Sequence, residues 1–300
     1  MMIVSAQSAT LRDTPVDFLP LRLKRYFFGI DTDDIYEIRL RISRPVCVVG
    51  KLGKSYITSV GKLSKKADKG IVISRKDIED AVEILTSSSI YSYADEIKNG
   101  YITAYGGHRV GVCGTMTADG EFMTDISCLN YRFAREVMGV ADEVIDGILN
   151  NGQVKSTLIV SRPGCGKTTF LRDLVRQISD RGINISVIDE RGEICAVCEG
   201  IPGFEVGSCT DIIDRCSKRY GMTLMLRTMS PRVIAVDEFD FAADADVISS
   251  ASRSGVSVFA TAHCGDWRRE IPKDILSQFK CIIVLSDKKG PGTVEEVVYV

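Results

Sequence analysis

Residues 161 to 168 read Ser-Arg-Pro-Gly-Cys-Gly-Lys-Thr, the strongest structural signal in the chain. They follow the apolar run 157–160 and precede a helix-like stretch, 169–178. A small residue, four free positions and then Gly-Lys-Thr form the pattern of a phosphate-binding loop, whose backbone N–H groups curl around phosphate oxygens at a helix N-terminus. Ser161 stands where that pattern has its first glycine. The alternative interpretation is a Gly-rich turn that only caps a helix.

The chain around this loop alternates strand and helix signals, as a parallel sheet covered by helices does. The strand signals are rich in Val and Ile, which fits burial on both faces. Apolar residues at helical spacing predict a helix over 169–179, and another is expected over about 140–149. The expected strands span residues 157–161, 183–188, 233–236, 256–261, 281–285 and, at an edge, 295–300.

The first half of the chain has shorter strand signals and is interpreted as a smaller α+β domain. A helix is expected near 76–86. Residues 18–28 mix aromatic with basic residues, and we favour a helix that packs its apolar side on the domain over one that lies on a membrane surface. The expected strands are 37–40, 45–49, 101–105 and 109–115.

Length and composition indicate a protein of about two domains. The chain has 300 residues, 45% of them hydrophobic, and a net charge of -2, which gives no general attraction to nucleic acid. Ten cysteines occur without a recognisable secretory leader, so a reducing cytoplasm is the expected compartment. No run approaches the ~18–20 apolar residues of a spanning helix, so no membrane-spanning segment is expected.

Two groups of residues predict nucleotide chemistry, with ATP and Mg²⁺ as cofactors. Lys167 would reach the β- and γ-phosphates, and the Thr168 hydroxyl would reach Mg²⁺. The apolar run 233–236 ends in Asp237 and Glu238, a pattern in which the first carboxylate holds Mg²⁺ through water and the second orients the attacking water. The expected nucleotide-binding residues are Ser161, Arg162, Pro163, Gly164, Cys165, Gly166, Lys167, Thr168, Thr169 and Asp237.

A second acidic cluster, Asp189-Glu190-Arg191-Gly192-Glu193, follows the expected strand 183–188. Because parallel strands end at one edge of a sheet, this cluster should lie near the same nucleotide. Glu190 and Glu193 therefore rival Glu238 as the catalytic base. His263 follows the strand 256–261 and could sense the γ-phosphate, although a single histidine is usually structural.

The spacing Cys195-x-x-Cys198, with Cys209 and Cys216 beyond it, raises the possibility of a zinc site. The remaining spacings are loose, so we favour small buried thiols. No Ser-His-Asp constellation is legible.

These segments together resemble the stage III sporulation protein AA family, which is related to the type II and type IV secretion ATPases and the pilus-retraction ATPases. The resemblance extends over roughly residues 18 to 285. The segments that carry it are Glu37-Ile38-Arg39-Leu40-Arg41, Gly100-Tyr101-Ile102-Thr103, Gly106-Gly107-His108-Arg109-Val110-Gly111, the phosphate loop, the acidic cluster, Ser230-Pro231 with 233–238, and Ala260-Thr261-Ala262-His263.

The resemblance implies a RecA-like P-loop ATPase domain over residues 139–300, with a mostly parallel sheet flanked by helices. It implies a smaller α+β N-terminal domain over residues 1–138. In the related ATPases the counterpart of 189–193 is an acidic box, and His263 falls in a His box. Basic residues of the N-terminal domain approach the nucleotide phosphates in those relatives. Arg109, Arg132 and Arg135 are therefore the expected arginines that act when a domain or subunit closes.

The resemblance also implies a setting. It indicates a cytoplasmic ATPase of the mother cell, attached to the membrane through partners, that powers assembly of or transport through a channel between mother cell and forespore. A homo-oligomeric ring, with a hexamer favoured, and membrane proteins of the channel complex are the expected partners. Nucleic acid is not expected, because the acidic balance and the lack of an aromatic-basic stripe argue against a translocase.

The sequence departs from the family pattern at three places. Ser161 replaces a glycine and could tighten the loop by restricting its backbone. Cys209 stands where an arginine is expected before Thr-Asp, which would remove a positive charge near the site. Phe239-Asp240 replaces Ile-Gly. The departures at Ser161 and Cys209 support an alternative function, a nucleotide-gated binding module with little hydrolysis.

Overall fold

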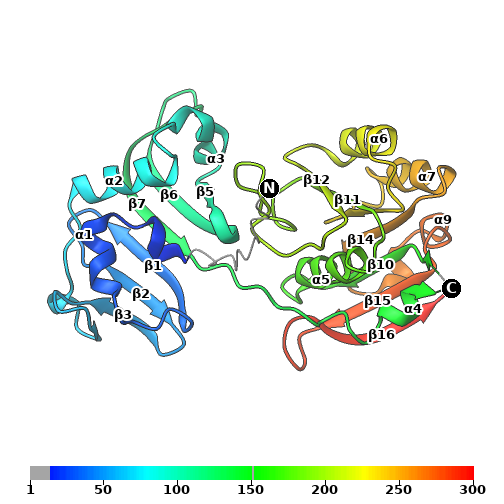
Figure 1. The fold of residues 1–300 in the computed structure, drawn as a ribbon, viewed down its shortest axis with the longest axis horizontal. Coiled ribbons are helices and arrows are strands. Elements are labelled where there is room, and N and C mark those ends of the chain that lie inside the picture. The colour runs from blue at the N-terminus through cyan, green and yellow to red at the C-terminus, as the bar shows by residue number, and fades with distance from the viewer. Residues whose placement is uncertain (1–13, 151) are drawn as a thin grey trace, which may run out of the picture. The chain divides into compact units, whose positions relative to one another are not determined.

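The computed structural model describes residues 14–150 and 152–300. They form two compact units, each described here by itself (Figure 1). The first unit runs to Arg135 and also contains Cys198–Gly203; the second consists of Glu136–Val197 and Phe204–Val300. The chain therefore passes between the units three times. A domain boundary at 138/139 stays a prediction, but Cys198–Gly203, which was expected in the second domain, belongs to the first unit.

The first unit contains a seven-stranded antiparallel sheet in the order β4-β3-β2-β1-β7-β6-β5. Its helices are α1 (Leu21–Lys24), α2 (Arg75–Leu85) and α3 (Ala94–Lys98), with 3₁₀ turns at Pro15–Phe18, Arg25–Phe27, Ala67–Lys69, Ile90–Tyr93 and Tyr105–Gly107. The strands are β1 (Ile35–Arg41), β2 (Cys47–Gly50), β3 (Gly53–Ile57), β4 (Leu63–Ser64), β5 (Tyr101–Ala104), β6 (His108–Met116) and β7 (Met123–Arg132).

Strand β7 lies between β1 and β6, yet the sequence did not predict it. Its inward residues Leu129 and Tyr131 are buried, whereas Cys128, Asn130 and Arg132 alternate with them on the other face. The strand therefore has one apolar face, and its polar half hides the strand signal.

Helix α2 packs on the sheet through an apolar stripe. Ser74 caps it: its hydroxyl accepts the Asp77 N–H, and the Asp77 carboxylate accepts the Ser74 N–H in return. Ile78 and Ala81 belong to the same hydrophobic core as the strands.

The segment 18–28 forms short helical turns and not one continuous helix. Leu19, Leu23 and Phe27 are buried in the core of the first unit, which agrees with the favoured packing. Leu21 and Phe28 remain exposed.

The second unit contains a seven-stranded sheet in the order β12-β11-β13-β14-β10-β15-β16, parallel except for β16. A separate ribbon pairs β8 (Leu149–Asn150) with β9 (Gln153–Val154). The strands of the large sheet are β10 (Thr157–Ser161), β11 (Ile185–Asp189), β12 (Thr210–Asp214), β13 (Val233–Val236), β14 (Ser257–His263), β15 (Cys281–Ser286) and β16 (Thr293–Tyr299).

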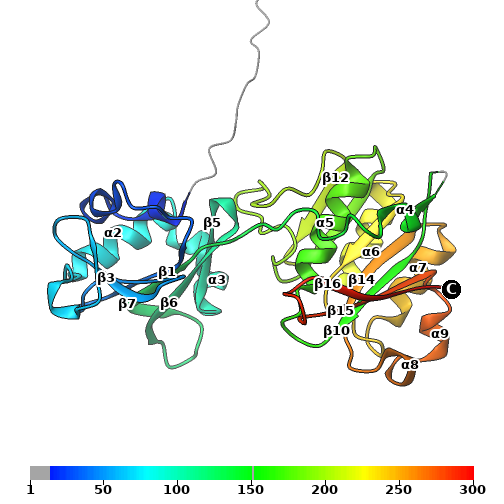
Figure 2. The ribbon, with the colours of Figure 1, turned by 90° about the horizontal axis from the view of Figure 1, so that it is seen from below.

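Helices cover both faces of this sheet (Figures 1 and 2). In β10, Ile159 packs into one core with α5, whereas Leu158 and Val160 pack into another core with α6 and α7. This alternation explains the continuous Val and Ile content of the strand. The helices are α4 (Ile145–Ile148), α5 (Lys167–Ser179), α6 (Lys218–Thr228), α7 (Ala245–Arg253), α8 (Trp267–Glu270) and α9 (Lys273–Leu276).

Two expectations for the second unit differ from the structure. The helix expected over 140–149 shrinks to α4, because Leu149 already joins the β8–β9 ribbon and the Ala141 N–H donates to the Asp173 carboxylate. The edge strand β12 was missed, because Asp211 and Asp214 interrupt its short apolar run.

Candidate nucleotide site

Four parallel strands end at one edge of the second sheet and bring the predicted residues together. In the register of β10 and β14, Ser161 lies opposite His263. Asp237 directly follows β13, and Asp189 ends β11. The carboxyl edge of a parallel sheet is where such folds bind their ligands.

The phosphate loop depends on two glycines. Gly164 and Gly166 have φ values of 80° and 84°, in the left-handed region that glycine tolerates. A Cβ on Gly166 would lie 2.8 Å from the backbone nitrogen of Gly292, so the loop also packs closely on the segment just before β16. Gly166 caps α5, whose first N–H groups point out of the loop and suit an anion.

Ser161 does not occupy such a position. It is the last residue of β10, it is buried, and its φ is not positive. Its hydroxyl donates to the Arg162 carbonyl over 2.8 Å. This strand position does not require glycine, so the serine causes no backbone strain. The expectation that its side chain tightens the loop stays a prediction.

Lys167 lies at the centre of the site. Its ammonium is 2.9 Å from His263 Nδ1 and 3.4 Å from the carbonyl oxygens of Ser161 and Arg162. Burial lowers the pKa of Lys167, while the nearby Asp237 carboxylate counteracts this. The ammonium is therefore only partly compensated and suits an incoming anion.

Thr168 and Asp237 place oxygen ligands side by side. The Thr168 hydroxyl donates to Asp237 Oδ2 over 2.5 Å, and the Thr261 hydroxyl donates to Asp237 Oδ1. Mg²⁺ prefers oxygen ligands and takes only one or two carboxylates, with water and phosphate completing its shell. The donor set of Thr168 and Asp237 fits such an ion.

Glu238 is held by its backbone and by two side chains. Its φ is +47°, and its N–H donates to the Thr261 hydroxyl over 2.9 Å. Arg191 Nη1 lies 2.5 Å from Glu238 Oε2, and His263 Nε2 lies 3.7 Å from Oε1. A strained residue fixed in this way is typical of a functional site.

The contacts of His263 define its tautomer. An ammonium cannot accept a hydrogen bond, so His263 Nδ1 accepts from Lys167 and Nε2 carries the proton. That N–H faces Glu238. Lys167, His263 and Glu238 thus form one polar chain.

The acidic cluster contains one structural and two accessible carboxylates. Asp189 is buried and accepts the backbone N–H groups of Glu193, Ile194 and Cys195 over 2.7–3.2 Å. Burial raises the pKa of Asp189, although these hydrogen bonds lower it again. Asp189 therefore shapes the acidic loop through its backbone.

Glu190 and Glu193 are the two accessible carboxylates of the acidic cluster, and they lie near Glu238. Lys218 lies 2.8 Å from Glu190. The three glutamates, with Asp189, Arg191, Lys218 and Asp237, line a cavity of about 10 Å³. That volume is about what one water molecule needs.

Arg172 was not predicted, although it joins the phosphate-loop helix to the acidic loop. It is buried and donates to the Ile194 carbonyl over 2.5 Å and to the Glu193 carbonyl over 2.7 Å. Its guanidinium lies 3.7 Å from the centre of the Phe204 ring. The sequence did contain a signal for this role: Arg172 falls among the apolar, buried positions of α5, and a buried charge requires a hydrogen-bonding partner.

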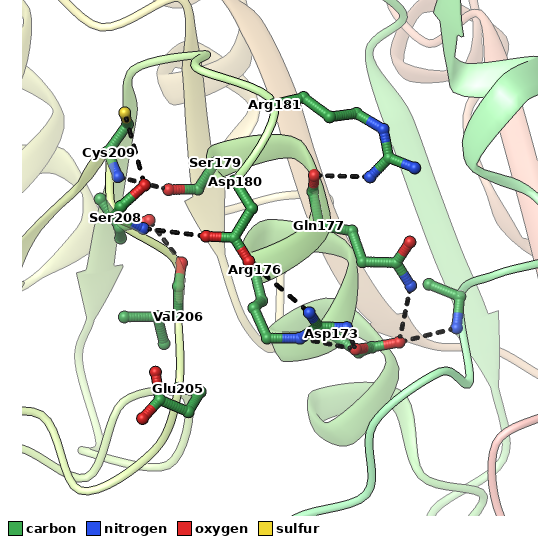
Figure 3. A network of polar contacts seen from close by, with 12 residues as sticks. Asp173, Arg176, Gln177, Ser179, Asp180, Arg181, Glu205, Val206, Ser208 and Cys209 are labelled. Carbon is green, nitrogen blue, oxygen red and sulfur yellow. Dashed lines mark hydrogen bonds and ion pairs between the residues drawn. The ribbon is translucent and has the colours of Figure 1, made fainter. Parts of the chain in front are cut away.

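Cys209 lies far from the phosphate loop. Its N–H donates to the Ser179 hydroxyl over 2.7 Å, and the neighbouring Ser208 N–H donates to Asp180 (Figure 3). Ser179 ends α5, which begins at the loop, so 13 residues of helix, roughly 18 Å, separate the two ends. The expectation that Cys209 removes a charge near the site is therefore wrong, because Cys209 precedes β12 at the amino edge of the sheet.

The same network anchors the middle of α5. Asp173 accepts from Arg176 and Gln177 (Figure 3). It also accepts the Ala141 N–H, and Gln177 donates to Asp142 as well. These bonds fix the chain that leads into the second unit.

The three predicted arginines all belong to the first unit, whereas the phosphate loop belongs to the second. Arg109 stacks on the Tyr101 ring at 3.8 Å and pairs in register with Arg132 on the next strand. Arg132 lies 4.0 Å from Glu37. Arg135 donates to the Asp33 carbonyl over 2.5 Å. Their approach to a nucleotide stays a prediction.

The Cys195-x-x-Cys198 pair is divided between the units. Cys195 is buried beside Asp189 in the second unit, and burial raises its pKa well above the usual value. Cys198 is buried in the first unit, where its thiol lies 3.5 Å from the Thr103 carbonyl. Within residues 14–150 and 152–300, no group of three or more His, Cys, Asp or Glu side chains is placed to hold a metal by itself.

No helix of the described residues is long and apolar enough to cross a membrane.

Comparisons with known proteins place this geometry in a family. The family model described as Sporulation stage III, protein AA matches residues 16–299. Stage III sporulation protein AA of Bacillus subtilis (strain 168) is 35% identical over 281 residues, which cover 88% of this chain and 86% of the relative.

Solved structures show the fold. The pilus retraction motor PilT with bound ADP superposes with a TM-score of 0.52 at 17% identity, covering 83% of this chain and 74% of that one. The ATPase DotB of Yersinia pseudotuberculosis gives a TM-score of 0.52 at 14% identity, covering 83% and 70%. The predicted α/β fold, a RecA-like domain preceded by a smaller α+β domain, is confirmed. The chain belongs to the sporulation stage III protein AA family.

Proposed function

We propose that this protein is a secretion-type ATPase that binds and hydrolyses ATP during endospore formation. Turnover would power assembly of, or transport through, a channel complex between mother cell and forespore. The observation that carries the proposal is the convergence of Lys167, Thr168, Asp237 and Glu238 at one sheet edge. Family membership supports the sporulation setting.

The nucleotide would lie on the loop from Ser161 to Thr169. The backbone N–H groups at the start of α5 and the Lys167 ammonium would hold its phosphates. Thr168 and Asp237 would hold Mg²⁺, which neutralises charge on the phosphate oxygens when it is bound. On this proposal Lys167 exchanges its contact with His263 for one with phosphate.

Glu238 is the proposed catalytic base, because it follows the Mg²⁺ ligand and lines the small cavity. A water there would donate a proton to its carboxylate. Glu190 and Glu193 line the same cavity and are the competing bases. When Lys167 turns to phosphate, the His263 ring loses its partner on Nδ1 and is free to respond to the γ-phosphate.

The proposal extends to assembly. We propose a homo-oligomeric ring, a hexamer by preference, in which Arg109, Arg132 and Arg135 reach the phosphates when a domain or subunit closes. The domains would divide near residue 138. The ring would work in the cytoplasm of the mother cell, bound to membrane proteins of the channel complex.

Phosphate release by the purified protein tests the enzyme activity. Lys167→Ala should lower turnover at least about 100-fold and weaken ATP binding, whereas Glu238→Gln should lower turnover by a similar factor and preserve binding. If wild-type protein, with and without its membrane partners, is no more active than the Lys167 variant, the ATPase function is wrong. Glu190→Gln and Glu193→Gln, measured alongside, identify the base as the position with the largest loss.

The arginines need a separate measurement. Alanine at a true phosphate-contacting position should abolish hydrolysis and keep nucleotide affinity, because the contact forms only in the transition state. Equal loss of both quantities would return that arginine to a structural role.

A nucleotide-gated binding module is the second candidate, and the Arg191 contact favours it. A guanidinium 2.5 Å from the Glu238 carboxylate occupies the proposed base. Arg191→Ala separates the two functions: a restrained ATPase gains turnover when the ion pair is removed, whereas a gated module binds ATP tightly and still releases no phosphate.

A further inference from the structure

The first unit contains an open groove of about 570 Å³ that no part of the proposed nucleotide chemistry uses. One wall is α2, and the other is the beginning of β7, residues 123–126. The two elements pack on each other, so the groove is part of the folded unit. Its residues all lie between positions 75 and 126, within the first unit.

The floor of the groove is apolar. Ile78 and Val82 from α2 are almost fully buried at its base, and Met123 and Ile126 of β7 face them half-buried. Ile90 closes one end and leaves 41% of its surface exposed. The groove therefore offers partly exposed apolar side chains to one face of a helix, whose contacts recur at positions i, i+3, i+4 and i+7.

The rim of the groove is acidic. Glu79 and Glu83 lie one turn apart on the exposed side of α2, and Asp125 lies on the opposite wall. Among the described residues that line the groove, Arg75 is the one basic residue, and its guanidinium is 3.7 Å from Asp125. The two glutamates therefore leave a net negative edge beside the apolar floor. This arrangement is complementary to basic side chains that flank an apolar stripe.

Two residues that line the groove have a left-handed backbone conformation. Ser88 and Asp125, both lining residues, have φ values of 62° and 45°. L-residues rarely adopt this conformation, and it persists where the surrounding structure imposes it. Ser88 also donates to the Glu83 carboxylate over 3.4 Å, which joins the end of the groove to its rim.

We propose that this groove, defined by Arg75–Ile90 of the α2 region and Met123–Ile126, docks a basic amphipathic helix of a partner protein. The apolar stripe of that helix contacts the partly exposed side chains of Ile90, Met123 and Ile126, and its lysines or arginines face Glu79 and Glu83. The proposal rests on the proposed function for its biological setting, in which membrane proteins of the channel complex recruit the ATPase. The groove itself needs no nucleotide.

The wall of the groove has 11 helical residues, about 16 Å, so three to four turns of a partner helix span it. The probe is therefore an 18-residue peptide with leucine at helical spacing and lysine on both flanks, labelled with a fluorophore. Full-length protein without ATP should raise its anisotropy. A peptide of the same composition with the leucine spacing scrambled should bind at least about ten-fold more weakly, because it presents no apolar face.

The variant Glu79→Lys/Glu83→Lys should weaken binding of the amphipathic peptide about ten-fold at low salt, and the difference should shrink as salt rises. Asp34→Lys/Asp68→Lys makes the same change in net charge at exposed positions outside the groove and should bind as wild type. Ile90→Asp alters the floor at a half-exposed position and should also abolish binding. Unchanged unfolding midpoints confirm that each variant is folded.

Three results would overturn the proposal: equal binding of both peptides, equal weakening by the groove and control charge reversals, or no effect of Ile90→Asp. Vesicles of phosphatidylglycerol and phosphatidylcholine provide the last arm. The acidic rim predicts that they do not bind at the groove, so vesicle binding that Ile90→Asp removes would make the groove a membrane surface instead. Because binding is measured without ATP, a lack of ATPase activity leaves these outcomes unaffected, and failure of the groove leaves the ATPase assay unaffected.

Discussion

Replacing Arg172 by methionine should destabilise the second unit and displace the acidic loop. Methionine keeps the unbranched part of the side chain as far as the position of Nε, but it removes the donors to the Glu193 and Ile194 carbonyls and the contact with Phe204. Two hydrogen bonds from a charged group are worth about 1.5–3 kcal/mol each. Burial lowers the pKa of Arg172, which shows that the guanidinium also loses hydration in the fold. Subtracting that penalty leaves an expected loss of about 2–4 kcal/mol.

Urea unfolding followed by tryptophan fluorescence measures this loss directly. The chain has a single tryptophan, Trp267, and it lies in the second unit, so the signal follows that unit alone. With a slope of about 2 kcal/mol per molar urea, the midpoint should fall by about 1–2 M. ATP turnover should fall as well, because Glu190 and Glu193 lie on the displaced loop.

The matched control is Arg181→Met, just beyond the end of α5. Arg181 makes one hydrogen bond, to the Gln177 carbonyl, at the exposed end of the helix. Its loss should cost less than about 1 kcal/mol. A midpoint for Arg172→Met within about 0.5 M of the control midpoint, which is about 1 kcal/mol at a slope of about 2 kcal/mol per molar urea, would refute the role given to Arg172.

Three further changes test the loop and the first unit. Gly166→Ala should weaken ATP binding and cost more stability than Gly164→Ala in urea unfolding, because both have positive φ but only Gly166 would bring a Cβ within 2.8 Å of Gly292; equal costs would contradict the close packing. Ser161→Gly should leave ATP turnover within about two-fold of wild type, since the strand conformation needs no glycine; a large gain would contradict this. Asp77→Asn should cost at most about 2 kcal/mol near neutral pH, because bonds from Arg22 and Ser74 outweigh burial and hold the pKa of Asp77 at about 2 rather than 3.8. This stability is present above pH 4 and lost as pH falls towards 2, so wild type and variant should converge there in acid unfolding.

Most of the site was legible in the sequence because short motifs follow strands that end at the same edge. Lys167, Thr168, Asp237 and His263 come together for this reason, and the register of β10 with β14 and of β13 with β14 sets their spacing. Periodicity also located the buried strands, whose residues face two cores.

The rest depended on partners distant in the sequence. The buried role of Asp189 arises from three backbone donors in its own loop, which no motif indicates. Arg172 reaches carbonyls about 20 residues away. The place of Cys209 at the opposite edge of the sheet follows from the direction of β12, a strand that the sequence did not predict.

The segment Cys198–Gly203 means that neither unit is one continuous piece of chain. A fragment ending at residue 138 would lack Glu199, which accepts from the Tyr105 hydroxyl and from Ser87. The complementary fragment would carry the buried Cys198 without the carbonyl of Thr103 that it faces. Exchange of domains between relatives therefore has to move this short insertion together with the first unit, and recombination at a single point separates residues that fold as one body.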